Sequence, residues 1–293
     1  MKVGIIGMGV MGENHLRVYK NLGVDVTCVC DIKYKGKKPN NITGYYTDYK
    51  KMIKFNNLDI ISVTVPTKLH KKIAIDCIKA GINVIIEKPM ACNTKECDKI
   101  IKIAEKKGVK VMIGHLERFN PAVIELKRNL SKIGKIYKVS AKRVGPFHPR
   151  IRDTGVVLDL AIHDIDILTY LIGEIKESYS VTNNIGLRSE DLFNSVLIFE
   201  NNAVGNIETD WISPEKERTL EITGEFGKFK LDYLNKTLVY FNEADFKYFE
   251  IKKTEPLKLE LTSFIKSVEA DLKPEITGEE GRKAVYLVEK FIG

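Results

Sequence analysis

The chain has 293 residues, of which 44% are hydrophobic and 29% charged, and its formal net charge at pH 7 is +8. This balance is typical of globular proteins and excludes disordered and fibrous classes. The length predicts two domains. No apolar run approaches the roughly 20 residues of a membrane span, and the first residues lack the apolar region of a signal peptide. We therefore expect a cytoplasmic protein with no membrane partner.

The cysteines and the excess of basic residues suggest no special chemistry. An odd number of cysteines without an export signal predicts free thiols, and no histidines accompany them at zinc spacing, so we expect no metal. The basic residues favour exposed helix faces and do not form a stripe interleaved with aromatic side chains, which argues against nucleic-acid binding. The five cysteines are Cys28, Cys30, Cys77, Cys92 and Cys97.

The first 117 residues alternate between strand and helix patterns. The strand-like runs are short, continuously apolar and rich in Val and Ile, as expected for strands covered on both faces. The segments between them are amphipathic at helical spacing. This alternation predicts an α/β fold with a doubly wound parallel sheet. The predicted strands are 3–6, 24–30, 58–65, 83–87 and 109–114, and the predicted helices are 13–22, 49–55, 69–80 and 94–107.

The pattern changes near residue 120, where successive strands with short turns predict an α+β domain with a large, open, mostly antiparallel sheet. We therefore divide the chain into a dinucleotide-binding domain, 1–118, and a substrate-binding and oligomerisation domain, 119–293. The second domain is predicted to contain helices at 121–130, 156–171, 257–270 and 279–291, and strands at 135–144, 178–183, 191–199, 203–210, 219–223, 228–233 and 238–241.

A G-x-G-x-x-G run follows the first predicted strand and opens the first predicted helix. Gly7 allows the turn out of the strand, Gly9 lets backbone amides approach a pyrophosphate, and Gly12 lets helix and strand pack closely. The run alone occurs often by chance, but its place in a βαβ unit makes an ordinary glycine-rich turn a poor alternative. The predicted cofactor contacts of this loop are Gly7, Gly9, Val10, Met11 and Gly12.

Asp31 ends the second predicted strand, where a carboxylate can hold the ribose hydroxyls of a dinucleotide. Its negative charge would repel a ribose 2′-phosphate, which favours NAD. Lys33 and Lys35 follow immediately and could neutralise such a phosphate, so NADP is not excluded.

Lys88 lies beyond the end of a predicted strand, between Glu87 and Pro89. Ligands of open α/β sheets bind at the carboxyl ends of strands, so this ammonium group could meet the nicotinamide and the substrate and stabilise a developing alkoxide. The alternative is an exposed lysine before a turn-forming proline.

The predicted helix 156–171 carries polar residues at i, i+4, i+7 and i+11: Asp159, His163, Asp166 and Tyr170. They form one stripe, which we interpret as a face turned towards a cleft. His163 could take a proton near neutral pH, and Asp159 could orient it. A solvated helix face and a metal site built from Asp159, His163 and Asp166 are the alternatives.

Two further segments are candidates for binding. Pro66 ends a buried strand, and Thr67 after it is a plausible N-cap of the next helix, near the cofactor. Arg150 and Arg152 lie in an irregular cationic loop and could clamp phosphates, although ordinary surface arginines would look the same.

Together these residues resemble the Gfo/Idh/MocA family of oxidoreductases. The specific part of the resemblance is Glu87-Lys88-Pro89 with the later Asp159-x-x-x-His163; it extends over about the first 175 residues. The resemblance implies an NAD(P)-dependent dehydrogenase of sugars or cyclitols, with Lys88, His163 and Asp159, the neighbour of His163, as catalytic residues. It also implies that Pro89 is cis. The cofactor would be lined by Pro66, Thr67, His70, Glu87 and Lys88.

Within the family, segments 114–121 and 158–166 look most like those of enzymes that oxidise the 3-hydroxyl of UDP-N-acetylglucosamine. Arg118, Arg150, Arg152 and Asp159 would then contact the substrate. The alternatives are a dehydrogenase of inositol or a free sugar, and a non-catalytic NAD-sensing protein on the same scaffold. Relatives cover the open sheet by association, so we expect a homodimer or homotetramer.

Overall fold

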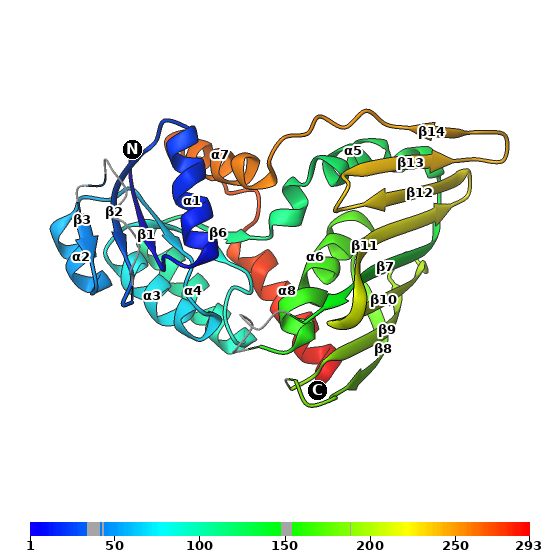
Figure 1. The fold of residues 1–293 in the computed structure, drawn as a ribbon, viewed down its shortest axis with the longest axis horizontal. Helices are drawn as coiled ribbons and strands as arrows, with labels where there is room; N and C mark the ends of the chain where they lie inside the picture. Colours follow the sequence, from blue (N-terminus) through cyan, green and yellow to red (C-terminus); the bar gives the residue numbers. More distant parts are fainter. Residues whose placement is uncertain (34–41, 43, 148–153, 188) are drawn as a thin grey trace. The chain divides into compact units, whose positions relative to one another are not determined.

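The computed structural model describes residues 1–33, 42, 44–147, 154–187 and 189–293. It divides into two compact units (Figure 1). The first unit combines Met1–His115 with Leu257–Val285, and the second combines Leu116–Pro256 with Tyr286–Gly293. No helix in the described parts of either unit is long and apolar enough to cross a membrane.

The first unit contains a parallel sheet of six strands among the described residues, in the order β3-β2-β1-β4-β5-β6. This is the order of a dinucleotide-binding fold. Its switch point lies between β1 and β4, because successive strands are added on one side of β1 up to β3 and on the other side from β4 onward. The predicted α/β fold is therefore confirmed. The short strand β3 was not predicted. The strands are β1 Lys2–Ile6, β2 Asp25–Cys30, β3 Gly44–Tyr46, β4 Ile60–Val63, β5 Asn83–Glu87 and β6 Val111–Gly114.

Helices connect these strands, and their ends follow ordinary capping chemistry. In α4, the Asn93 side chain accepts a hydrogen bond from the Glu96 backbone N–H, and Gly108 ends the helix in the left-handed region at φ 64°. Its buried residues Cys97, Ile100 and Ala104 recur at helical spacing and face the sheet. The helices are α1 Val10–Asn21, α2 Tyr49–Phe55, α3 Thr67–Lys79 and α4 Thr94–Lys107.

The second unit is built on an eight-stranded sheet, counted over the described residues, in the order β14-β13-β12-β11-β7-β10-β9-β8. Its neighbouring strands are antiparallel except for the pair β7 and β10. The predicted open, mostly antiparallel sheet is confirmed. The strands are β7 Ile136–Pro146, β8 Ile175–Asn183, β9 Leu192–Phe199, β10 Val204–Asp210, β11 Ile212–Gly224, β12 Gly227–Asp232, β13 Thr237–Phe241 and β14 Phe246–Tyr248.

One face of this sheet is buried, as the alternation along β9 shows. Phe193, Leu197 and Phe199 are fully buried, whereas Val196 between them is 48% exposed. Helical segments of the same unit pack on the buried face, including α5 against β12 and β13 (Figure 1). These segments are η1 Leu116–Phe119, α5 Pro121–Asn129, η2 Leu130–Ile133, η3 Val157–Ala161 and α6 Ile162–Leu171.

The last two helices correct the predicted domain division at 118/119. α7 (Pro256–Glu269) and most of α8 (Gly278–Ile292) belong to the first unit, because Leu257–Val285 pack with Met1–His115. The Ile113 backbone N–H at β6 donates to the Ile276 carbonyl, which joins the returning segment to the end of the parallel sheet. An amphipathic pattern shows that a helix buries one face, but not against which domain.

The predicted single helix 156–171 is also corrected. Val157–Ala161 form a π-helical turn, and α6 begins only at Ile162. A π turn advances more residues per turn than an α-helix, so the i, i+4 spacing of Asp159 and His163 does not place both on one straight stripe. π turns are frequent at functional sites.

Candidate active site

The glycine loop begins at the end of β1, where Gly7 requires a backbone that other residues rarely adopt. Its φ is 97°, and a Cβ there would lie 2.7 Å from the carbonyl oxygen of Thr64. The Gly7 N–H donates to the Cys30 carbonyl at 2.8 Å, and its own carbonyl accepts from the Thr64 hydroxyl at 2.6 Å. The turn is thus tied to strands on both sides of β1.

The other two glycines fit a bound pyrophosphate. A Cβ at Gly12 would lie 1.9 Å from the Gly7 carbonyl oxygen, so helix and turn touch here, whereas a Cβ at Gly9 would meet nothing within 4 Å. Gly9 is the N-cap of α1 and supplies no side chain to the first N–H groups of the helix. An open helix N-terminus favours an anion, so Val10, Met11 and the glycines suit a dinucleotide.

Asp31 follows β2 and is bonded to the same loop. One carboxylate oxygen accepts from the Met8 N–H at 2.8 Å, and the other accepts from the Lys33 N–H at 2.7 Å. A carboxylate has about four acceptor sites, so both oxygens can still accept from ribose hydroxyls. Lys35, the second residue considered for a 2′-phosphate, lies outside the described residues.

The segment between β4 and α3 differs from the prediction in its cap. Pro66, not Thr67, is the N-cap residue, and Thr67 is the first residue of the helix. His70 on α3 is buried, and its two ring nitrogens lie 2.8 Å from the carbonyl oxygens of Val65 and Pro89. It therefore joins the end of β4 to the segment that follows Lys88.

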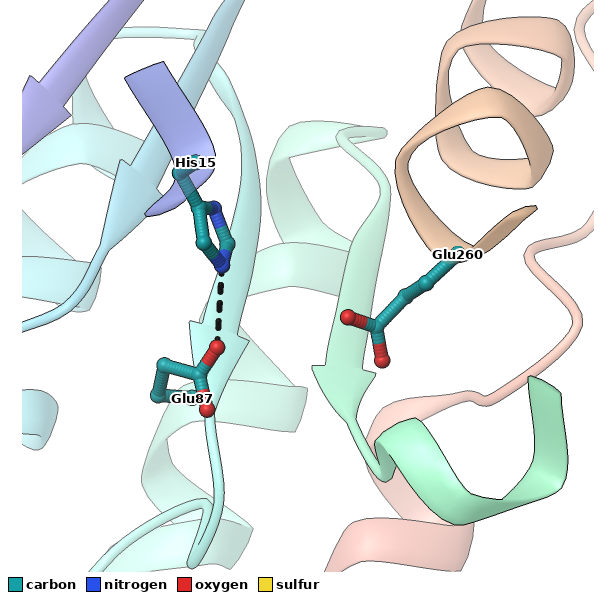
Figure 2. Close-up of side chains that lie close together, drawn as sticks. All are labelled: His15, Glu87 and Glu260. Carbon is teal, nitrogen blue, oxygen red and sulfur yellow. Dashed lines mark hydrogen bonds and ion pairs between the residues drawn. The ribbon is translucent and has the colours of Figure 1, made fainter. Parts of the chain in front are cut away.

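Lys88 directly follows β5 at the carboxyl edge of the parallel sheet and is half-buried, and its peptide bond to Pro89 is cis, as the resemblance implied. The preceding Glu87 accepts a hydrogen bond of 2.9 Å from His15 Nε2 (Figure 2). His15 was not selected from the sequence. Its position three residues after Gly12, on the inner face of α1, is the signal that could have identified it.

In the second unit, Asp159 lies within the π turn and His163 at the start of α6, and both side chains are half-buried. Burial, and the neighbouring Arg143 after it, lower the pKa of Arg218, while Asp159 is among the carboxylates that act in the opposite direction. Arg218 on β11 is thus a cation within electrostatic reach of Asp159. It was not predicted, because nothing in the local pattern of β11 distinguishes it.

The rest of the predicted polar stripe contacts arginine and lysine side chains of the second unit. Asp166 is buried and forms a bidentate ion pair with Arg118, with contacts of 2.7 and 2.9 Å. The Arg118 guanidinium also lies 4.6 Å from the ring centre of Tyr170. Because Arg118 is buried and bound by Asp166, we no longer assign it to the substrate.

A second buried ion pair holds the other side of α6. The Arg143 guanidinium donates to Asp164 at 2.8 and 3.1 Å and to Glu117 at 3.2 Å. Burial alone would lower the pKa of Arg143, but Asp164 and Glu117 raise it above its usual value. The predicted substrate residues Arg150 and Arg152 lie outside the described residues.

Family models match both units. One, described as an oxidoreductase family with an NAD-binding Rossmann fold, matches residues 1–115, and the GFO/IDH/MocA C-terminal domain matches residues 129–230. The myo-inositol 2-dehydrogenase of Thermotoga maritima is 27% identical, over 98% of this chain and 94% of that protein. The UDP-N-acetylglucosamine 3-dehydrogenase of Acidithiobacillus ferrooxidans is 26% identical, over 78% of this chain and 76% of that protein.

Solved structures show the same fold. The structure of the Acidithiobacillus ferrooxidans enzyme matches with a TM-score of 0.89 at 24% identity, covering 99% of this chain and 96% of that one. A levoglucosan dehydrogenase in complex with NADH matches with a TM-score of 0.90 at 20% identity, covering 100% of this chain and 96% of that one.

Two glycine substitutions separate folding from cofactor binding. Gly9→Ala adds a methyl group that meets no protein atom, so we expect an unchanged melting temperature but weaker NADH binding. Gly12→Ala forces α1 away from Gly7, so we expect a lower melting temperature and loss of NADH binding. Thermal melts and titration of NADH fluorescence measure both. Equal NADH affinity for Gly9→Ala and the wild-type protein would contradict this placement of the pyrophosphate.

Proposed function

Because the chain belongs to the Gfo/Idh/MocA family of NAD-dependent oxidoreductases that act on CH–OH groups, we propose that it oxidises the 3-hydroxyl of a UDP-N-acetyl sugar. NAD supplies the hydride acceptor. The observation that carries the proposal is the position of Lys88. It directly follows Glu87, the last residue of β5, at the carboxyl edge of the parallel sheet, the edge at which the glycine loop also lies.

In this proposal the first unit binds the dinucleotide and stabilises charge. The glycine loop receives the pyrophosphate at the start of α1, and Asp31 accepts from the adenosine ribose hydroxyls. Pro66, Thr67 and Glu87 line the same edge of the sheet, and His70 holds the Lys88 segment against α3. The Lys88 ammonium stabilises negative charge as it develops on the substrate oxygen.

The second unit supplies the group that accepts the proton of the substrate hydroxyl. His163 accepts the proton of the reacting hydroxyl, and Asp159 stabilises the charged ring that results. The half-buried Arg218 near Asp159 adds a positive charge, which suits a substrate that carries anionic or strongly polar groups. The diphosphate of a nucleotide sugar would be held by Arg150 and Arg152.

A dehydrogenase of inositol is the second candidate. It is favoured by the Thermotoga maritima relative, whose match extends over nearly the whole of both chains. Screening UDP-N-acetyl sugars, myo-inositol and free sugars with NAD, by the absorbance of NADH, distinguishes the two candidates directly.

Lys88→Ala tests the proposed catalytic lysine. We expect turnover to fall by about 100-fold or more, because the developing charge loses its electrostatic partner, while NADH binding stays nearly unchanged. Steady-state kinetics and NADH titration measure the two effects. Lys95→Ala, which removes an exposed lysine of nearby α4, is the control and should behave as wild type. Wild-type turnover in Lys88→Ala would rule out this role.

The double change Arg150→Ala and Arg152→Ala tests the substrate class. If the substrate is a UDP-sugar, its KM should rise about tenfold or more, because charge-assisted hydrogen bonds to the diphosphate are lost. The KM for myo-inositol or a free sugar should not change. The measurement is KM for each substrate that the screen identifies, and an unchanged KM for a UDP-sugar would exclude the proposed clamp.

We also propose a homodimer or homotetramer that associates through the open face of the eight-stranded sheet. Tyr179, Val181, Val196 and Val204 are apolar side chains of β8–β10, and between 48% and 67% of each is exposed. Tyr179 pairs with Val196 across the sheet, so the exposed side chains of β8 and β9 adjoin in an apolar patch. A patch of this kind marks an interface.

Val196→Glu is therefore expected to give a monomer of 33.3 kDa, because a carboxylate cannot be buried unpaired at the interface. Size-exclusion chromatography with light scattering measures the mass. Lys230→Glu, on the charged part of the sheet at β12, is the control and should retain the wild-type mass. A monomeric wild-type protein would exclude association through this face.

A further inference from the structure

A largely buried polar cluster in the first unit is formed by His15, Glu87 and Glu260, and Glu87 directly precedes Lys88 (Figure 2). His15 comes from α1, Glu87 is the last residue of β5, and Glu260 comes from the returning helix α7. One polar atom from each residue lies within 4.8 Å of the others. The carboxyl group of Glu260 is directed towards the pair formed by His15 and Glu87 (Figure 2).

The His15 side of the cluster has its hydrogen bonds complete. His15 Nε2 lies 2.9 Å from Glu87 Oε1, and Nδ1 lies 3.1 Å from the Ser62 hydroxyl, which lies 2.9 Å from the Tyr19 hydroxyl. Burial raises the pKa of Tyr19, so it keeps its proton. One arrangement satisfies all four groups: Tyr19 donates to Ser62, Ser62 donates to Nδ1, and Nε2–H donates to the Glu87 carboxylate.

Glu260 accepts no hydrogen bond from Tyr19, Ser62 or His15. Its side chain is 0% exposed, and neither carboxyl oxygen has a hydrogen-bond partner among the described residues. Burial first, and the charge of Glu87 second, raise the pKa of Glu260 well above its usual value. An ionised Glu260 would place two carboxylates close together in a largely buried site, which a single proton prevents.

We propose that Glu260 is a positioning residue that keeps its proton and donates it to Glu87 through one water molecule, since no direct hydrogen bond joins the two carboxyl groups. The donated bond fixes the free side of the Glu87 carboxylate, as His15 fixes the other side. Glu87 directly precedes Lys88, so the bond stabilises the segment that presents the lysine and lines the cofactor. This inference rests on the role proposed above for Glu87 and Lys88.

A divalent cation is the competing occupant, since one histidine and two carboxylates form a possible ligand set. A cation would need the Nε2 lone pair, which requires the existing bond from His15 to Glu87 to break. A proton on Glu260 leaves every bond of the cluster in place. The geometry therefore favours the proton.

Three variants test the proposal. Glu260→Gln keeps the size and a donor but cannot ionise, Glu260→Leu removes the donor, and Glu269→Gln changes an exposed glutamate on the same helix as a control. We expect Glu260→Leu to weaken NADH binding about tenfold, because the Glu87 carboxylate loses a buried donor. Glu260→Gln and Glu269→Gln should bind NADH as the wild-type protein does.

Infrared spectra of protein labelled with ¹³C-glutamate observe the proton directly. At neutral pH the wild-type protein and Glu269→Gln should show the carbonyl band of a protonated carboxyl group, and Glu260→Gln should lack it. Absence of this band from the wild-type protein would overturn the proposal. This spectrum needs neither substrate nor turnover, so it stands apart from the Lys88→Ala test of the proposed function.

The pH dependence of stability gives a second readout. An unfolded glutamate loses its proton above about pH 4.3, whereas folded Glu260 keeps it, so wild-type stability falls relative to Glu260→Gln as the pH rises. We expect the melting temperature of Glu260→Gln to gain on that of the wild-type protein between about pH 5 and pH 8. A constant difference would contradict a buried proton, and equal NADH affinities for Glu260→Leu and wild type would contradict the positioning role.

Metal analysis closes the remaining alternative. Purified wild-type protein should contain no stoichiometric zinc or manganese, and added Zn²⁺ or Mn²⁺ should not raise its melting temperature more than that of Glu260→Gln. One bound metal ion per chain that is lost in Glu260→Gln would replace the proposed proton with a cation.

Discussion

The first unit depends on a close approach between Gly12 at the start of α1 and the carbonyl oxygen of Gly7 at the end of β1. A Cβ at residue 12 would lie 1.9 Å from that oxygen, so no side chain fits. The same carbonyl accepts from the Thr64 hydroxyl, and the Met8 N–H beside it donates to Asp31. One backbone contact thus aligns the helix N-terminus, the switch point and the carboxylate of Asp31, and the proposed cofactor site depends on it.

The second unit is held together differently, through side-chain charges. Asp164 and Asp166 flank Ile165 on α6 and pair with Arg143 on β7 and Arg118 on η1. Removing one partner of such a buried pair leaves an unpaired charge, at a cost of about 3–5 kcal/mol. When both ion pairs are formed, the rotation of α6 about its own axis is fixed. The orientation of His163, between the π turn and these pairs, follows from that rotation.

This difference explains what could be predicted. The glycine loop and Asp31 are encoded by local spacing, and the sheet classes by periodicity, so both were accessible from the sequence. The partners of Arg118 and the proximity of Glu260 to Glu87 depend on segments far apart in the chain, which no local pattern encodes. The π turn at Asp159 and the return of α7 to the first unit were not predicted either. An apolar stripe shows which face of a helix is buried, but not the local helix type or the domain against which the face packs.

The two units also neutralise buried carboxyl groups by different means, and the means have different consequences. Asp164 and Asp166 are matched by arginines, whose charge persists throughout the physiological pH range. Glu260 is matched by a proton, which the solution can remove. From about pH 4.3 upward the unfolded chain has already lost that proton, so the buried proton makes the first unit less stable as the pH rises, until Glu260 itself ionises. Rising pH therefore acts on the first unit through Glu260, close to Glu87 and the segment that carries Lys88.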